Sequence, residues 1–326
     1  MADWASQEWR AEAVAWLDES LAAVGMTRSG EVTQPHLRPW ATALRAPTDR
    51  GPVWLKAPGP GTAFEVLIYP VIHRAAGESV LEPIAVDERR SWIVLPDGGP
   101  TLWQQAEENR QALVEGMIAA IGDYGRLQRH VQPFTAELLA RGVPDMRPEV
   151  MPLRFAEAAD SVAAFADDGA SEDDRAAYRR ALALRPEFDR WCERLASSPL
   201  GGGLDHHDLH PGNILGEPGE PAMFYDWGDA VVAHPFACML VPLQYVVSIA
   251  DADAVVRLRD EYLRAFDDVA PRDELAQTLD LACRVAKAAR TLTWQRALAA
   301  VQEPEHEFAA APLQTFVSLE KESYRS

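Results

Sequence analysis

Apolar positions near the N-terminus follow two different periods. From residue 4 to residue 24 they recur every three or four residues, and Gly25 then ends the pattern, which predicts an amphipathic helix. The runs that follow are short and separated by turn residues, as is typical of strands. We predict strands at about 31–38, 40–45, 53–56, 81–86 and 91–95. The N-terminal part is therefore expected to hold a mixed sheet and one or two helices.

A second helix is expected between the third and fourth of these strands. Residues 63–76 place apolar side chains on one helical face, at Phe64, Leu67, Ile68, Val71 and Ile72. Pro70 stands in the middle of this segment, where its ring and its missing N–H would break or kink a helix at Tyr69. The helix is predicted in spite of this residue.

Beyond residue 100 the pattern is mainly helical. Pro96 to Pro100, with two glycines between them, interrupts regular structure and indicates a boundary near residue 97. The chain is thus expected to divide into residues 1–97 and 98–326, and 326 residues with 48% hydrophobic composition suffice for two ordinary cores. The helices predicted for the second part are 101–107, 110–140, 155–167, 171–183, 186–196, 236–249, 253–267, 272–300 and 306–323.

A short segment between these groups of helices, residues 204–230, predicts a loop followed by a hairpin. Pro211-Gly212 bends the backbone so that Asp208 and Asn213, five positions apart, can face one spot. The residues that follow predict a strand, a turn and a returning strand, at 214–215, 216–221 and 223–225. A hairpin of this length brings Asp226 back beside Asn213.

Three side chains of this segment suit phosphoryl transfer. The carboxylate of Asp226 and the amide oxygen of Asn213 are hard ligands, which can hold Mg²⁺ against the phosphates of a nucleotide. Asp208 would then face the attacking hydroxyl. The alternative is a chance acidic loop in an acidic protein.

The order of these residues resembles the catalytic core of protein kinases, in which His-x-Asp-x-x-x-x-Asn is followed by Asp-x-Gly. It is most similar to the aminoglycoside phosphotransferase-like branch, with His-Gly-Asp-Leu-His-Pro-Gly-Asn and Asp-Trp-Gly-Asp. His207 replaces the usual Gly, and the matching residues are His206, Asp208, Leu209, His210, Pro211, Gly212, Asn213, Asp226, Trp227, Gly228 and Asp229. We expect His206 to be a packed histidine rather than a base, and the role of His210 is left open.

The resemblance implies an α+β, two-lobed protein-kinase-like fold. The small N-terminal lobe would carry a β-sheet and bind the nucleotide, and the larger, mainly helical C-terminal lobe would hold the catalytic hairpin and the acceptor. The resemblance also implies that Asp208 is the catalytic residue and that Asn213 and Asp226 hold the metal.

Lysine usage points to a further site residue. Only three of the 31 Lys and Arg residues are lysines, and one of them, Lys56, ends the apolar run Val53-Trp54-Leu55. A compact ammonium suits phosphate oxygens in a tight cleft, where the planar fork of Arg is not equivalent. The alternative is an ordinary surface lysine. In the family that the chain resembles, this position is the strand lysine that holds the α- and β-phosphates.

A lysine in this role needs a carboxylate that fixes its direction. Glu65 is the only acidic residue of the helix predicted at 63–76, so it is our candidate partner for Lys56. The alternative is a first-turn glutamate, favoured by the helix dipole, with no partner.

By the same resemblance, backbone groups near Val94 to Pro96 would bind the adenine edge, where the chain passes between the lobes. A plain interdomain linker is compatible with this role. The glycine-rich loop of protein kinases has no counterpart here, because Pro39 and Trp40 stand between the first two predicted strands. Lys56 and the metal would then have to bind the phosphates without such a loop.

Net charge limits the possible partners. A formal net charge of −19 argues against nucleic acid, because neutralising phosphates needs a basic face. It is compatible with a cationic acceptor, although general acidity also serves solubility. Carboxylates in the region where the family builds acceptor pockets are Asp229, Asp251, Asp253, Asp260 and Glu261.

The cysteines and the termini indicate the compartment. Cys192, Cys238 and Cys283 are scattered, with no CxxC pair, which argues against a disulfide framework and a zinc site and fits a reducing cytoplasm. No signal peptide and no membrane span are apparent, so we expect a cytoplasmic protein without a membrane partner.

The expected function is ATP- and Mg²⁺-dependent phosphorylation of a hydroxyl on a small molecule, an aminoglycoside or another antibiotic, with GTP left open in place of ATP. One alternative is a metabolic kinase of an amino sugar, a sugar or an amino alcohol. Another is a non-catalytic nucleotide-binding module. The joint presence of Lys56, Asp208, Asn213 and Asp226 disfavours this last alternative.

Overall fold

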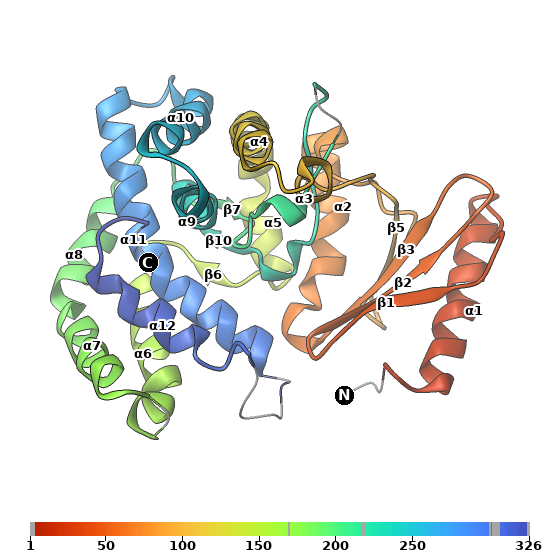
Figure 1. Ribbon diagram of the computed structural model, residues 1–326, viewed down its shortest axis with the longest axis horizontal. Helices are drawn as coiled ribbons and strands as arrows, with labels where there is room; N and C mark the ends of the chain where they lie inside the picture. The colour runs from red at the N-terminus through yellow and green to blue at the C-terminus, as the bar shows by residue number, and fades with distance from the viewer. Residues whose placement is uncertain (1–3, 169, 217–218, 300, 302–306, 325–326) are drawn as a thin grey trace.

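The computed structural model describes residues 4–168, 170–216, 219–299, 301 and 307–324. A small N-terminal part built on a sheet lies beside a larger, mainly helical part (Figure 1). The α+β organisation expected from the sequence is confirmed.

The N-terminal sheet has five strands in the order β1-β2-β3-β5-β4. The strands are β1 (Thr33–Arg38), β2 (Ala41–Ala46), β3 (Val53–Pro58), β4 (Ala85–Asp87) and β5 (Trp92–Pro96). All neighbouring pairs are antiparallel, so the prediction of a mixed sheet is wrong. The reason is that β5 inserts between β3 and β4. The predicted fourth strand is also shorter than expected, because Leu81 packs into the core of the larger part instead.

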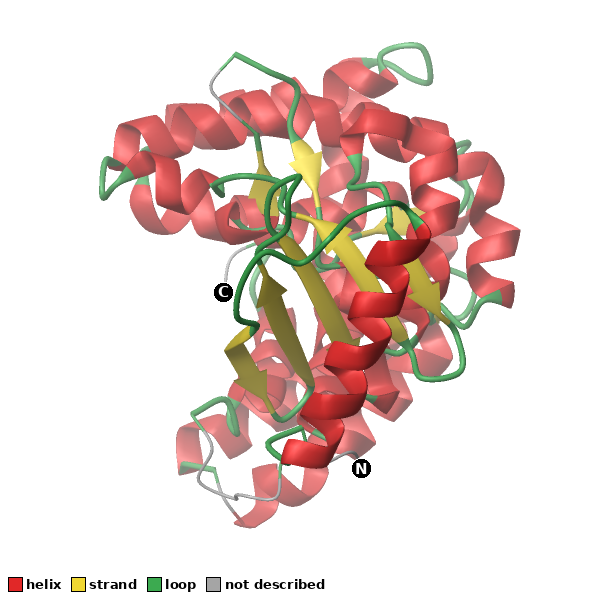
Figure 2. Cartoon of the chain, turned by 90° about the vertical axis from the view of Figure 1, so that its right-hand side faces the viewer, coloured by secondary structure: helices red, strands yellow, loops and turns green. Residues whose placement is uncertain are grey.

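The N-terminal part also contains two helices, which pack differently. Ser6 caps the N-terminus of α1 (Gln7–Ala23), because its hydroxyl accepts a hydrogen bond from the N–H of Trp9. The helix buries its apolar face against Leu44, Leu55 and Trp92 of the strands. Figure 2 shows α1 lying across the strands. α2 (Phe64–Ala76) instead joins the core of the larger part, where it packs on α4 (Arg110–Val131).

Pro70 does not end α2. The helix runs from Phe64 to Ala76 with Pro70 inside it. Its buried side chains, among them Ile68 before the proline and Val71 after it, pack into the core, and this burial offsets the hydrogen bond that Pro70 cannot make.

The larger part holds the remaining helices. They are α3 (Leu102–Ala106), α4, α5 (Thr135–Ala140), α6 (Met151–Asp168), α7 (Glu172–Ala183), α8 (Arg185–Ala196), α9 (Leu240–Ile249), α10 (Ala252–Leu263), α11 (Arg272–Leu298) and α12 (Ala311–Val317). The helix predicted at 110–140 is interrupted by a 3₁₀ turn at Gln132–Phe134, which contains Pro133. Of the helix predicted at 306–323, His306 lies outside the described residues.

Three short strands of the larger part were not predicted. β6 (Asp145–Met146), β7 (Gly203–Asp205) and β10 (Val231–Ala233) form a sheet in the order β6-β10-β7. Strands of two or three residues are too short to show a period of their own. This small sheet supports both ends of the segment that carries the candidate catalytic residues.

The predicted hairpin is present. β8 (Ile214–Leu215) and β9 (Met223–Phe224) pair antiparallel, with Ile214 opposite Phe224 and Leu215 opposite Met223. Glu217 and Pro218 of the predicted turn lie outside the described residues. The pairing places Asn213 and Asp226 at the same end of the hairpin.

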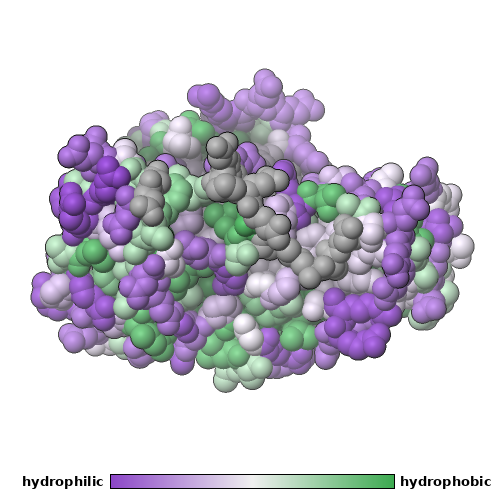
Figure 3. Space-filling view, turned by 90° about the horizontal axis from the view of Figure 1, so that it is seen from below, coloured by the Kyte–Doolittle hydropathy of each residue, from purple (hydrophilic) through white to green (hydrophobic). Residues whose placement is uncertain are grey.

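The described cysteines and the surface add little further chemistry. All three cysteines are buried with free thiols. Over the described ranges, no helix is long and apolar enough to cross a membrane. On the face drawn in Figure 3, hydrophilic groups alternate with small apolar areas.

Candidate active site

Lys56 lies at the centre of an ion-pair cluster between the two lobes. Its ammonium is 2.7 Å from Glu65 Oε1 and 2.6 Å from Asp226 Oδ1. Pairing of β3 with β2 and β5 places Lys56 opposite Ala43 and Ile93, which fixes its backbone from both sides. Glu65 comes from the first turn of α2. The structure therefore brings Lys56 and its expected partner together, and adds Asp226 to the pair.

The charges of this cluster depend on one another. Burial disfavours the charged form of Lys56, but the carboxylates of Asp226 and Glu65 outweigh it, so the pKa of Lys56 is raised. Burial raises the pKa of Glu65 to about 7, against the opposing effect of Lys56. At Asp226 burial also acts upward, yet the Lys56 ammonium holds the pKa of that carboxyl below its usual value. A charged lysine and an ionised Asp226 thus face each other at neutral pH.

The backbone at Asp226 is unusual. Asp226 has φ 65° and ψ 61°, the left-handed region that L-residues rarely adopt, and its N–H donates to the Tyr69 hydroxyl at 3.2 Å. Its side chain is 47% exposed, so solvent can reach it. Two residues later, a Cβ at Gly228 would lie 3.2 Å from Glu65 Oε2, so a glycine there lets the loop approach α2.

Asp208 is held by contacts on both sides of its carboxylate. Oδ1 accepts a hydrogen bond from Arg290 Nη2 at 2.6 Å, and Oδ2 lies 3.5 Å from His210 Nε2. The backbone carbonyl of Asp208 accepts from Asn213 Nδ2 at 2.9 Å, which closes the predicted bend. This last bond uses the amide nitrogen of Asn213 and leaves its amide oxygen for another ligand.

The pair Asn213 and Asp226 suits a hard metal ion. The N–H of Tyr225 points to the carbonyl of Asn213 at 3.4 Å, so Asp226 follows directly beside Asn213, as the hairpin predicted. One amide oxygen and one carboxylate match what Mg²⁺ takes from a protein when phosphates and water complete its shell. No group of three His, Cys, Asp or Glu residues that could hold a metal by itself occurs among the described residues.

Two histidines of the loop are structural. His206 is fully buried, with Nε2 2.8 Å from the Tyr225 carbonyl and its ring against Trp227, and burial lowers its pKa. This agrees with a packed histidine. His207, which replaces the usual Gly, has φ 64°, and burial holds its pKa well below the usual value. Its Nδ1 lies 2.8 Å from the hydroxyl of Thr293 on α11.

His210 faces Asp208. The N–H of Gly212 donates to His210 Nδ1 at 3.0 Å, so in the neutral ring the proton sits on Nε2, toward Asp208. The ring stacks on Trp103 at 4.6 Å, and the Trp103 indole donates to the Tyr245 hydroxyl at 2.8 Å. Trp103 is 47% exposed, which is high for an indole fixed in this way.

Arg290 is a residue of the site that the sequence did not reveal. It lies on α11 and donates to Asp208, to Asp229 Oδ2 at 3.2 Å and to the carbonyl of His207. Burial raises the pKa of Asp229 to about 6, with Arg290 acting downward and Asp208 upward. No local motif marks Arg290, because it stands in an ordinary helical run 82 residues after Asp208.

The residues predicted to bind the adenine edge, Val94 to Pro96, lie on β5. The carbonyl of Val94 accepts from Ile84 N at 2.8 Å, and Val94 also pairs with Leu55 of β3. Pro96 ends the strand opposite Val53 and has no N–H to donate. The Val94 backbone is thus engaged by the sheet on both sides, and the adenine role of Val94 and Pro96 stays a prediction.

The acidic residues proposed for a cationic acceptor lie on or next to α10. α10 packs on α4 and α9. Two of its carboxylates form ion pairs with nearby arginines, Asp260 with Arg259 and Glu261 with Arg264. Within the described ranges, no hydrogen bond or ion pair joins these carboxylates to the catalytic loop. Asp229, the remaining carboxylate predicted for the acceptor pocket, is different because it forms an ion pair with Arg290 beside Asp208.

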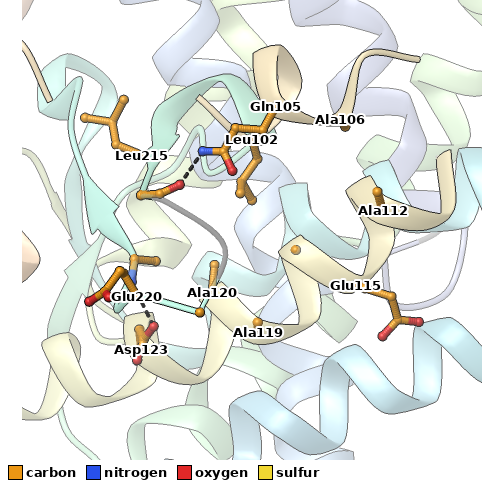
Figure 4. A pocket seen from close by; sticks show the side chains of 14 residues that line it. Leu102, Gln105, Ala106, Ala112, Glu115, Ala119, Ala120, Asp123, Leu215 and Glu220 are labelled. Atoms are coloured by element: carbon orange, nitrogen blue, oxygen red, sulfur yellow. Dashed lines mark hydrogen bonds between the residues drawn. The ribbon is translucent and has the colours of Figure 1, made fainter. Parts of the chain in front are cut away.

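A cavity of about 330 Å³ lies beside the hairpin rather than at Lys56 and Asp208. Its wall combines Leu102 and Gln105 of α3, the alanine-rich face of α4, and Leu215 (Figure 4). Asp123 at its edge accepts the N–H of Ala222 at 3.0 Å, which ties α4 to the hairpin.

Solved structures of similar fold are small-molecule phosphotransferases and kinases. A macrolide 2'-phosphotransferase type I is 17% identical with a TM-score of 0.59, covering 93% of this chain and 96% of that chain. A choline/ethanolamine kinase family protein from Mesorhizobium loti is 17% identical with a TM-score of 0.60, covering 95% of each chain. A spectinomycin phosphotransferase in complex with ADP and spectinomycin is 15% identical with a TM-score of 0.51, covering 93% of each chain. These likenesses confirm the two-lobed kinase-like fold.

A comparison with curated proteins found no match. A family model described as the phosphotransferase enzyme family, however, matches residues 48–276, which include Lys56, Glu65, Asp208, Asn213 and Asp226. The chain therefore belongs to the phosphotransferase enzyme family and is a phosphotransferase that uses an alcohol group of a small molecule as acceptor.

Proposed function

We propose that this enzyme transfers the γ-phosphoryl group of ATP, with Mg²⁺, to a hydroxyl of an aminoglycoside or another antibiotic. The observation that carries the proposal is the Lys56 cluster. The ammonium is held between Glu65 and Asp226 at 2.7 and 2.6 Å, and the hairpin pairing sets Asn213 next to Asp226. A cation suited to phosphate oxygens thus lies close to two residues with hard oxygen atoms, which supports binding of a nucleotide with Mg²⁺.

The roles on the nucleotide side follow from this geometry. Lys56 would hold α- and β-phosphate oxygens, and Glu65, fully buried in α2, would fix the direction of the ammonium. Asn213 and Asp226 would hold the metal, which would offset the negative charge of the phosphates. Backbone groups near Val94 to Pro96 would meet the base.

On the acceptor side, Asp208 would orient the hydroxyl and take its proton. The hydroxyl oxygen forms a bond to the γ-phosphorus while the bond from that phosphorus to the β,γ-bridging oxygen breaks, so the nucleoside diphosphate leaves. Oδ2 of Asp208 is the oxygen suited to the proton, since Oδ1 already accepts from Arg290.

The acceptor is proposed to be cationic, and two observations support this. The net charge of −19 gives the protein a field that favours cations. Next to His210, the exposed indole of Trp103, fixed by its bond to Tyr245, offers an aromatic face to an amine. The paired carboxylates of α10 contribute to the field rather than to direct contacts.

The same aromatic face favours a second candidate, a metabolic kinase of an amino alcohol or amino sugar. One solved structure of similar fold is a choline/ethanolamine kinase family protein, and choline and ethanolamine are small amino alcohols. A compact amine could lie on Trp103 and Tyr245 with its hydroxyl toward Asp208.

Nucleotide consumption measured against a panel of acceptors would test these candidates. The panel should hold aminoglycosides, macrolides, spectinomycin, amino sugars and amino alcohols, with ATP and GTP compared and with Asp208→Asn as the inactive control. Acceptor-dependent release of ADP with an antibiotic supports the first candidate. Release only with amines of metabolism supports the second, and no acceptor-dependent release with any compound would contradict both.

A further inference from the structure

Arg290 has a place in this site that the family match does not supply. The matched family model ends at residue 276, whereas Arg290 lies beyond it on α11. We propose that Arg290 is a positioning residue, which fixes the carboxylate of Asp208 by binding Oδ1 so that Oδ2 faces the acceptor hydroxyl. This inference rests on the proposed role of Asp208.

The contacts of Arg290 converge on the catalytic loop. Its Nη2 donates to Asp208 Oδ1 at 2.6 Å, and its Nη1 donates to Asp229 Oδ2 at 3.2 Å and to the carbonyl of His207. The side chain is only 12% exposed. Charge-assisted bonds of this length, shielded from water, restrict a carboxylate far more than a surface pair does.

The guanidinium is itself held in place. Trp294, four residues further along α11, lies against it with its ring centre 5.2 Å from the guanidinium carbon. Burial acts against the charge, but Asp208 and Asp229 raise the pKa of Arg290, so it stays charged. A rigid charged fork suits positioning better than a flexible side chain would.

Arg290 is not needed to hold α11. The helix packs on α6, α8 and α12, and its fully buried side chains include Leu279, Ala282 and Cys283. Among the residues that the structure describes, by contrast, the hydrogen bonds of the Arg290 side chain all go to the catalytic loop and to Asp229. Removal of the guanidinium should therefore free Asp208 without unfolding the helix.

The residue at which the loop departs from the family pattern, His207, is also held by α11. His207 stands where the family has Gly, and its left-handed backbone, with φ 64°, is unfavourable for a residue with a Cβ. Two hydrogen bonds to α11 offset this cost, one between the ring of His207 and the hydroxyl of Thr293 and one from Arg290 to the carbonyl of His207. The residue before Asp208 is thus held by the same helix turn as Asp208 itself.

The test is a series at position 290 in the full-length enzyme. In Arg290→Gln we expect kcat to fall by about 10²-fold, the scale for misplacing a reacting group by about 1 Å, with the KM values for ATP and acceptor little changed. Arg290→Lys should regain part of this loss. Guanidinium ion added to Arg290→Ala should restore activity in proportion to its concentration. Arg257→Gln, which removes the exposed 2.8 Å pair with Glu115, is the matched control and should change nothing.

Crystal structures of wild type and Arg290→Gln separate this inference from the proposed function. The carboxylate of Asp208 should be ordered in the wild type and rotated or disordered in the variant. If the wild-type enzyme phosphorylates no acceptor, the proposed function fails, but the two structures still decide whether Arg290 fixes Asp208. An unmoved Asp208 in the variant would overturn the inference, as would a raised acceptor KM with unchanged kcat.

Discussion

The ammonium of Lys56 lies 2.6 Å from Oδ1 of Asp226, a residue 170 positions later in the chain. This contact joins the sheet of the small lobe to the hairpin of the large lobe. It places the proposed phosphate-binding cation directly against the proposed metal ligand, so the two binding functions share one position.

Lys56→Arg should impair the enzyme although it keeps the charge. The wider guanidinium cannot replace a compact ammonium between Glu65 and Asp226, so kcat/KM for ATP should fall at least about tenfold, equivalent to about 1.4 kcal/mol. Glu65→Gln should give a milder loss. Steady-state kinetics with Lys321→Arg, the same change at an exposed position, provides the control. Full activity in Lys56→Arg would show that the phosphates are held elsewhere.

Asp208→Asn should lower kcat by at least on the order of 10²-fold, because no other carboxylate of the loop is placed to receive the hydroxyl proton. Nucleotide affinity, measured by calorimetry, should change little. Asp173→Asn, the same substitution in the exposed first turn of α7, should leave both quantities unchanged. Near-wild-type turnover in Asp208→Asn would refute the assignment.

Asp226→Ala and Asp229→Ala form a matched pair three residues apart. The first should abolish Mg²⁺-dependent binding of ATP, because it removes a hard oxygen ligand and one partner of Lys56. The second removes a partner of Arg290 and should disturb mainly the local structure or acceptor binding. Unchanged binding of Mg·ATP in the Asp226 variant would count decisively against the metal role.

Asp205 makes stability depend on pH. It is fully buried below the loop, with Oδ1 accepting the N–H of His207 at 2.7 Å, and burial raises its pKa from 3.8 to about 7. The folded state therefore holds a proton that the unfolded state releases above its lower pKa. The stabilisation that protonated Asp205 gives the folded state is fully present below about pH 4 and is lost as the pH rises to about 7.

Asp205→Asn should remove this dependence. The difference in unfolding free energy between Asp205→Asn and wild type should grow between pH 4 and pH 7 by up to roughly 4 kcal/mol, at about 1.4 kcal/mol per unit of pKa. Taking the difference cancels the titration of the buried histidines, which acts in the opposite direction. Urea unfolding at several pH values measures it, and parallel curves for the two proteins would contradict the buried protonated state.

A cationic acceptor should bind less well as salt is raised. Between 0.1 M and 1 M salt the Debye length falls from about 10 Å to about 3 Å, which screens the acidic field of the protein. The acceptor affinity should fall steeply over this range, while that of a neutral sugar, the control, should stay level. Indifference to salt would favour neutral acceptors such as sugars or macrolides.

Local chemistry explains what the sequence could predict of this site. Lys56 and Glu65 are nine residues apart across one turn, so a strand and a helix predicted separately already bring them close. The bend at Pro211-Gly212 and the short hairpin likewise set Asp208, Asn213 and Asp226 by turn geometry. Contacts of this kind can be predicted from the sequence because only a few residues separate the two partners.

Contacts between distant segments could not be predicted. Arg290 meets Asp208 only after α11 packs on α6 and α12, and nothing at position 290 distinguishes it from the other arginines of its helix. The antiparallel order of the sheet depends on β5 entering between β3 and β4. Pro70 shows the opposite case, in which packing of both helix faces overrides a local signal.

The order of the site residues along the chain, with α11 after all the others, bears on when the enzyme can first act during its synthesis. Chains are made and begin to fold from the N-terminus, and Arg290 is added 61 residues after Asp229. When Lys56, Asp208 and Asp226 of a nascent chain have left the ribosome, Asp208 would still lack the hydrogen bond from Arg290. By the loss expected for Arg290→Gln, transfer would be about 10²-fold slower until α11 docks, so the enzyme would reach its full rate only after this late helix has folded.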